Sequence, residues 1–308
     1  MKNDRLVSWG IFILLCIIWG SSFILMKASK VELTWAQIAS LRIFSAGVVM
    51  LPFALFYFSK IPVKKMPLVI LLGICGNLLP AYLFAAAISK NIDSGLAGIL
   101  NSLTPICVVV TGAIFFKSKI QSKKIIGVII GFIGLIVLTL VNKNGISFEN
   151  LEYTSWILLA TVAYGFNVNI VSHYLKDVHP IHLAVVSITT MIIPTGIVLL
   201  QQNFLDLPFD ENATRWAVIN IVTLGIAATA IATALFYVLV KKAGGLFASL
   251  VTYGIPFISL AWGFVDGEKI TIMQIGCLAI ILGGVYLANM PAKKETVSNS
   301  EFEFETKN

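Results

Sequence analysis

The stretch GLAGILNSLTP, residues 95–105, has a second copy later in the chain: GGLFASLVTYGIP, residues 244–256. Both copies are apolar and rich in small residues, and each ends on a proline, Pro105 or Pro256. A proline inside a helix removes one backbone donor and leaves the carbonyl four residues earlier without its partner. The two stretches therefore predict two interrupted helices at equivalent places in a duplicated chain.

The composition around these stretches is typical of a membrane protein. Of the 308 residues, 58% are hydrophobic and 12% are charged, whereas soluble globular domains carry about 25% charged residues. The apolar residues form blocks of about 20, the length of a helix that crosses a bilayer. Period-2 alternation is absent, which argues against a membrane β-barrel. The predicted spans are 7–26, 35–58, 66–88, 94–116, 123–141, 154–174, 182–202, 215–240, 246–266 and 271–289.

The duplication extends along the whole chain. Further pairs of similar segments are WGSSF (19–23) with YGFNV (164–168), LLGI (71–74) with TLGI (223–226), and IIGVIIGFIGLIVL (125–138) with QIGCLAIILGGVYL (274–287). Each half contains five predicted spans, and because five is odd, the second half enters the membrane in the opposite sense. Inverted repeats of this kind are typical of transporters. The fold class expected is therefore all-α integral membrane, with ten transmembrane helices in two inverted five-helix repeats.

The predicted domains are residues 7–141, residues 154–290 and a polar tail, 291–308, whose composition predicts disorder. Basic residues give the orientation. If the N-terminus is cytoplasmic, 15 of the 22 Lys and Arg residues lie in inside segments and 6 in outside segments. The positive-inside rule then places both termini in the cytoplasm. The Lys-rich loops are interpreted as membrane anchors, so no nucleic-acid partner is expected.

Several features together resemble the EamA-type transporters of the drug/metabolite transporter superfamily: ten spans, the WGSSF start, Arg42 in the second span, and the proline-containing fourth and ninth spans. The resemblance covers about residues 7–290. It implies a carrier in the inner or plasma membrane that exports small polar metabolites, such as amino acids or related solutes. One departure concerns an acidic residue that the family often shows after both of these spans. Glu268 follows the ninth, but Lys117 stands after the fourth, so the acid is assigned to loop capping.

Inverted-repeat transporters bind substrate near the midplane, where helices are interrupted. Asn101 and Thr252 each precede one of the two prolines by four residues, and they mark the predicted centre. Amides, hydroxyls, aromatic rings and one arginine inside the spans complete the predicted substrate-binding set: Trp19, Ser22, Asn77, Tyr82, Asn101, Tyr164, Asn167, Thr252, Tyr253 and Arg42. For each Ser, Thr or Asn, the alternative is a hydrogen bond that joins neighbouring helices.

Arg42 is the only charge well inside a predicted span. An arginine within the bilayer is costly and should face protein or water. It could pair with a carboxylate of the substrate. Alternatively, it could cap backbone carbonyls or extend its head group towards the outer surface.

The sequence indicates no catalytic residue, metal site or cofactor. The four cysteines lie inside predicted spans without a Cys-x-x-Cys motif, and the 15 Asp and Glu residues lie in loops or at span ends. Two other functions stay open. A flippase of lipid-linked sugars would need a cleft that faces the lipid, and a membrane enzyme acting on lipid-linked substrates would need a reactive cluster near the surface. Gly127-x-x-x-Gly131 permits close helix packing, either within a monomer or between the chains of a homodimer.

Overall fold

The computed structural model describes residues 2–29, 31–90, 100–118, 120–141, 151–265, 271–288 and 290. In this part of the chain, every element of regular secondary structure is helical. The α-helices are α1 (Lys2–Ser29), α2 (Trp35–Tyr57), α3 (Met66–Gly73), α4 (Leu79–Ser89), α6 (Thr104–Phe116), α7 (Ser122–Val141), α8 (Leu151–His173), α9 (Pro180–Thr189), α10 (Ile192–Gln201), α11 (Asn212–Leu224), α12 (Ala232–Ala243), α13 (Gly245–Ser249), α14 (Val251–Val265) and α15 (Ile272–Ala288). Short 3-10 helices are η1 (Phe58–Lys60), η2 (Val63–Lys65) and η4 (Phe204–Asp206).

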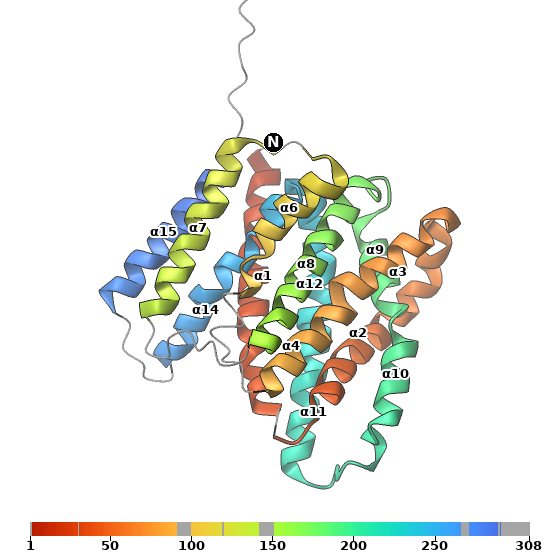
Figure 1. Cartoon of the computed structure of the whole chain (residues 1–308). Helices are drawn as coiled ribbons and strands as arrows, with labels where there is room; N and C mark the ends of the chain where they lie inside the picture. Colours follow the sequence, from red (N-terminus) through yellow and green to blue (C-terminus); the bar gives the residue numbers. More distant parts are fainter. Residues whose placement is uncertain are drawn as a thin grey trace, which may run out of the picture.

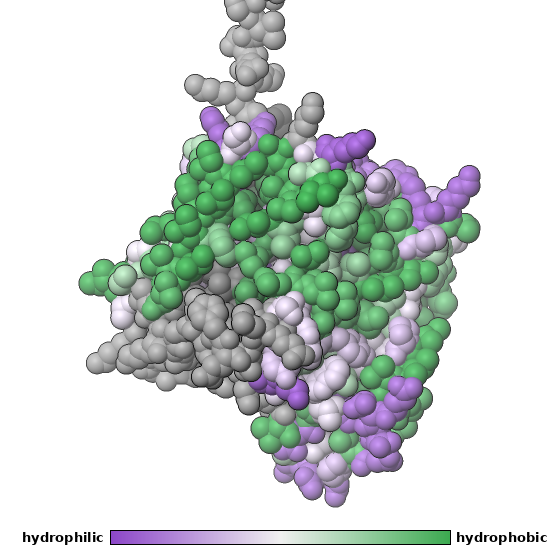
Figure 2. All heavy atoms as spheres, viewed as in Figure 1, coloured by the Kyte–Doolittle hydropathy of each residue, from purple (hydrophilic) through white to green (hydrophobic). Residues whose placement is uncertain are grey.

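The described residues include six helical stretches that are long and apolar enough to cross a membrane: Arg5–Ser22, Trp35–Lys60, Val63–Ser89, Ser155–His173, Pro180–Gln201 and Asn212–Ala243. Three shorter apolar stretches are Thr104–Phe116, Gly245–Ile258 and Ile275–Ala288. Apolar residues cover much of the face in Figure 2, with polar residues towards its two ends. The protein is therefore an all-α, multi-pass membrane protein. The count of ten spans stays a prediction, and the predicted tail, 291–308, lies outside the described residues.

Local sequence explains where the helices begin and break. Thr34 caps α2, because its hydroxyl accepts a hydrogen bond from the Gln37 backbone N–H and the Gln37 side chain accepts one from the Thr34 N–H. Gly244 separates α12 from α13 with a φ of 91°, a conformation that glycine adopts without steric cost. Pro194 cannot bond the carbonyl of Thr190, and the helix is interrupted between α9 and α10.

Two helices widen into π-helical segments at corresponding places in the two halves. The first, η3 (Ile74–Leu78), begins within the LLGI segment, and the second, η5 (Gly225–Ile231), begins within TLGI. In the first half, Pro80 removes the donor that would bond the Gly76 carbonyl, which favours a local change of helical pitch. Such π-segments occur frequently at functional sites.

The helices of the two halves are interleaved (Figure 1). In the bundle, α1 packs on α12 and α14, α4 and α6 pack on α8, and α2 packs on α9 and η5. Several side chains of α1 donate hydrogen bonds to backbone carbonyls of the second half: Cys16 to Val251 (3.5 Å), Trp19 to Ala228 (2.9 Å) and Ser29 to Ala217 (3.1 Å). Two further helices, α7 and α15, pack side by side at one edge of the bundle. The centre of the molecule is thus built from both halves.

Candidate functional site

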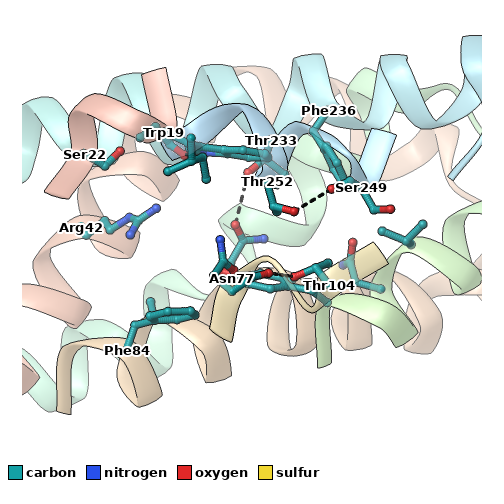
Figure 3. Close-up of a pocket in the computed structure, with 18 of the residues that line it drawn as sticks. Trp19, Ser22, Arg42, Asn77, Phe84, Thr104, Thr233, Phe236, Ser249 and Thr252 are labelled. Carbon is teal, nitrogen blue, oxygen red and sulfur yellow. Dashed lines mark hydrogen bonds between the residues drawn. The ribbon is translucent and has the colours of Figure 1, made fainter. Parts of the chain in front are cut away.

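A cavity lies at this centre, between helices of both halves (Figure 3). Its volume is about 130 Å³. Residues from α1, α2, α4, α6, α8, α12, α13 and α14 line it, together with Asn101 and residues of both π-segments. Its lining consists of Trp19, Ser22, Met26, Arg42, Gly76, Asn77, Ala81, Phe84, Asn101, Thr104, Tyr164, Asn167, Val168, Ala228, Thr233, Phe236, Tyr237, Ser249, Thr252 and Ile255.

The structure brings eight of the ten residues of the predicted substrate-binding set to this cavity: Trp19, Ser22, Arg42, Asn77, Asn101, Tyr164, Asn167 and Thr252. Tyr82 and Tyr253 lie elsewhere. The Tyr82 hydroxyl shares a 2.5 Å hydrogen bond with that of Ser40, and the Tyr253 hydroxyl donates to the Val128 carbonyl of α7 (2.8 Å). Adjacent residues on a helix are about 100° apart, so Tyr253 points away from the cavity that Thr252 lines.

The carbonyls that the two prolines leave without a helical donor both receive a hydroxyl. Thr104 donates to the Asn101 carbonyl (2.5 Å), which Pro105 frees. Ser102 donates to the Thr252 carbonyl (3.2 Å), which Pro256 frees. The second bond joins the proline-containing regions of the two halves. Both freed carbonyls therefore accept a hydrogen bond from a hydroxyl of the first half.

The amide side chains around the cavity differ in their bonding. Asn167 donates to the Leu72 carbonyl (3.1 Å) and to the Tyr237 hydroxyl (2.9 Å). Asn77 accepts a hydrogen bond from Thr233 (3.3 Å) across the cavity wall, but its buried Nδ2 has no hydrogen-bond partner in the described structure. An unpaired buried donor is costly, which makes Asn77 a candidate contact for a bound molecule.

Arg42 projects into the cavity from α2 (Figure 3). Its Nε donates to Thr229 Oγ1 of η5 at 2.8 Å. Of the two interpretations of Arg42, this position is compatible with a counter-ion for a substrate. The Arg42 side chain does not extend to the outer surface, because it lies in the cavity and bonds Thr229.

Comparison with known proteins assigns the chain to a family. The model of the EamA-like transporter family matches residues 8–140 and again residues 153–290. The chain belongs to this family. The central cavity therefore lies between two copies of a transporter-family domain.

Several relatives of this EamA protein are themselves named transporters. An "Uncharacterized transporter" of Archaeoglobus fulgidus is 28% identical over 280 residues, which are 91% of this chain and 97% of the relative. A "Probable amino-acid metabolite efflux pump" of Salmonella typhimurium is 24% identical over 294 residues, 89% of this chain and 92% of that protein. A solved crystal structure with 17% identity matches with a TM-score of 0.68 over 94% of this chain and 96% of its own, which shows a shared fold.

The cavity of the EamA protein also contains residues that the sequence did not single out for binding. Phe84 and Phe236 add aromatic surface, and Ser249 and Tyr237 add hydroxyls. Aromatic residues in a span look the same in sequence whether they pack in the core or line a cavity. For the hydroxyls, helical spacing was an available signal: Ser249 lies three residues before Thr252, and Tyr237 lies four after Thr233, so each pair shares a helix face.

This chain departs from the family pattern after the fourth predicted span, where Lys117 stands in place of an acidic residue. Lys117 ends α6 in the left-handed conformation, with a φ of 51°, and its backbone N–H bonds the Gly112 carbonyl. Lys117 therefore acts as a helix cap through its backbone. Glu268, its counterpart after the ninth span, lies outside the described residues.

Proposed function

We propose that this EamA-family protein exports small polar metabolites, amino acids or related solutes, by alternating access through the central cavity. The observation that carries the proposal is the lining itself, to which both halves contribute polar groups beside helix interruptions. A site at the interface of two repeats can be exposed to either side when one repeat moves against the other. The name of the Salmonella relative supports amino-acid metabolites and the outward direction.

The two ends of the cavity differ in a way that fits one state of such a cycle. On the proposed cytoplasmic side, the rings of Trp9, Phe12 and Phe247 pack together, with centroids 5.2–5.3 Å apart. On the opposite side, a second hollow of about 260 Å³ shares Met26 with the cavity and reaches Trp35 at the start of α2. This arrangement corresponds to a conformation that is closed towards the cytoplasm.

Contacts of two lysines with the loop between α8 and α9 also lie on the proposed cytoplasmic side. Lys241 at the end of α12 donates to the carbonyls of Leu175 (2.8 Å), Lys176 (3.0 Å) and Val178. Lys65 forms an ion pair with Asp177 of the same loop. Opening towards the cytoplasm would have to release these contacts.

The cargo can be identified by comparing the metabolites that accumulate in cells with and without the protein. We expect a soluble polar solute to accumulate without it and the wild-type protein to reverse the accumulation. Asn101→Leu should insert and fold but fail to reverse it, because it removes a cavity amide at similar volume. Asn220→Leu, on the partly exposed face of α11 and outside the lining, is the matched control.

Equal loss of function in the two variants would return Asn101 to a role in helix packing. Loss of folded protein in Asn101→Leu alone would do the same. Accumulation of a lipid-linked sugar in place of a soluble solute would favour the flippase.

The proposed orientation, with both termini in the cytoplasm, rests on the distribution of basic residues. It places the loop between α10 and α11, at the opposite end of the molecule from the N-terminus in Figure 1, outside the cell. Asn212 at the start of α11 is exposed. A single cysteine at this position, Asn212→Cys in a chain without other cysteines, should react with a membrane-impermeant thiol reagent in intact cells. Reaction only after the membrane is broken would reverse the orientation.

A further inference from the structure

The net charge of the cavity lining is unusual for a site buried between membrane helices. Among the described residues that line it, Arg42 is the only one with a formal charge at neutral pH, and none is an Asp or Glu. A charge within the bilayer is normally paired or placed in water. Within the described residues, the cavity therefore carries a positive charge that no carboxylate of its lining neutralises.

The hydrogen bonds of Arg42 also leave part of its guanidinium group without a partner among the described residues. A guanidinium group has five N–H donors, and within the described residues the Arg42 side chain uses only its Nε, on the neutral hydroxyl of Thr229. Its terminal nitrogens remain for a ligand or for water. The planar fork of an arginine matches a carboxylate, which can accept two parallel hydrogen bonds from it.

A second donor lies along the same cavity. Asn77 is 7% exposed, and its Nδ2 is buried without a partner. By contrast, the neighbouring hydroxyl groups already donate to the protein: Ser22 to the Ile18 carbonyl, Thr252 to the Ser249 carbonyl and Thr233 to Asn77 Oδ1. The groups still able to donate thus favour a ligand with more than one acceptor, such as a carboxylate accompanied by a carbonyl or hydroxyl oxygen.

The rest of the lining is suited to an apolar group. Trp19 and Phe84 face the cavity from opposite sides, and Phe236 lies near Trp19 with ring centroids 5.4 Å apart (Figure 3). Ligand sites commonly combine such apolar walls with a few polar groups that fix orientation. A small molecule with one charged end and one apolar end would be complementary to both parts.

We propose that the cargo of this cavity is a small organic monocarboxylate with a net negative charge, held by Arg42 at its carboxylate. This inference rests on the proposed transport function and narrows its substrate class. A zwitterionic amino acid would satisfy Arg42 but bring an ammonium group for which the lining has no carboxylate, and it would leave the site with a net positive charge. A 2-oxo acid, or an amino acid whose nitrogen is acylated, neutralises the site.

The charge preference can be measured without knowing the cargo. In a chain without its four native cysteines, Ser22→Cys places a thiol at the end of the cavity where Arg42 lies. The thiol is treated with an anionic reagent, sulfonatoethyl methanethiosulfonate, and with a cationic one, the trimethylammonioethyl analogue. Relative to the rates with a free thiol in solution, we expect the anion to react about tenfold faster than the cation, because a charged cleft concentrates ions of opposite sign.

Arg42 variants show whether this preference comes from the arginine. Arg42→Gln should abolish it, whereas Arg42→Lys should keep it. Thr229→Val removes the hydrogen-bond partner of Arg42 and keeps the charge, so it should also keep the preference and controls for a disturbed fold. A preference for the cation, no reaction with either reagent, or an unchanged ratio in Arg42→Gln would each overturn the proposal.

Binding to the purified protein provides a second, independent arm. Four compounds share a phenyl ring and a similar length: 3-phenylpropionate, 3-phenylpropanamide, L-phenylalanine and 2-phenylethylamine. We expect the carboxylate to bind about tenfold more tightly than the neutral amide, since a desolvated charge pair is replaced by neutral contacts, and Arg42→Gln should remove that difference. Tighter binding of phenylalanine or of the amine would contradict the proposal. A failure of the proposed transport function would look different, with normal charge selectivity but no solute that accumulates in the deletion strain.

Discussion

The α7–α15 pair and the helices around the cavity represent two ways of joining helices in one membrane protein. Where α7 meets α15, the backbones touch. A Cβ added at Gly284 would lie 2.4 Å from the Gly131 nitrogen, and one added at Gly127 would lie 2.4 Å from the Ala288 nitrogen. Small residues allow this close approach, and it favours helix association by van der Waals contact.

Around the cavity, by contrast, the helices are interrupted and joined through polar side chains. Asn169 of α8 illustrates this: its Nδ2 donates to the Val108 carbonyl and the Thr111 hydroxyl of α6, and also to the Gly165 carbonyl of its own helix, at 2.9–3.0 Å. Asn77 and Arg42 retain donors that the described residues do not use. Polar residues in a span therefore fall into two groups, those whose bonding is completed by the fold and those that keep unused donors.

The largest effect should follow from breaking the contact between α7 and α15. Gly284→Leu would place a side chain against the backbone of Gly131 and Gly127, which cannot move without separating the helices. We expect it to destabilise the protein by about 3 kcal/mol or more, or to prevent folding. Gly283→Leu is the matched control, because a Cβ at Gly283 meets nothing within 4 Å. Thermal unfolding in detergent compares the two, and similar melting temperatures would contradict the role given to close backbone contact.

A smaller effect should distinguish the two groups of polar residues. Asn169→Leu removes all the hydrogen bonds of the Asn169 amide, two of which join α8 to α6, and we expect a loss of about 1–2 kcal/mol in stability. Asn101→Leu should cost less stability than Asn169→Leu while it impairs transport, because the Asn101 side chain lines the cavity. Unfolding measurements on both proteins test this. A greater loss of stability in Asn101→Leu would mean that the two asparagines have the opposite roles.

The smallest effect concerns the hydroxyl that compensates for Pro256. Ser102→Ala should cost about 0.5–1 kcal/mol, because it leaves the Thr252 carbonyl without that donor. In the background Pro256→Ala, the restored N–H can bond the same carbonyl, so Ser102→Ala should then cost less. A double-mutant cycle on unfolding free energies measures this coupling. Equal costs in the two backgrounds would show that Ser102 does not compensate for the proline.

Much of this architecture could be predicted from the sequence, because the apolar blocks and the internal repeat each extend over many residues. The helical fold followed from the apolar blocks, and the family followed from the order of the spans, WGSSF (19–23), Arg42 and the two proline-containing stretches. Eight of the ten residues predicted to bind substrate also lie on the cavity, because polar groups inside spans rarely face lipid.

Side-chain direction and local pitch were harder to predict. Tyr253 was included because it adjoins Thr252, but neighbours on a helix face different ways, and its hydroxyl lies at the Val128 carbonyl. The π-segment η3 follows from Pro80 with hindsight, whereas η5 contains no proline to indicate it. Phe84 and Phe236 could not be separated from core residues, because their surroundings depend on how distant helices meet.

The hydrogen bonds of α1 have a consequence for the way the protein is made. The acceptors of Cys16, Trp19 and Ser29 follow their donors in the chain by 235, 209 and 188 residues. At a synthesis rate of about 5–20 residues per second, the first helix leaves the ribosome roughly 10–50 s before these partners exist. During that interval, lipid, water or the insertion machinery has to accommodate the indole N–H of Trp19, whereas the Ser29 hydroxyl can donate to the Leu25 carbonyl of its own helix. The first half of this protein therefore cannot reach its final packing until the second half is in the membrane beside it.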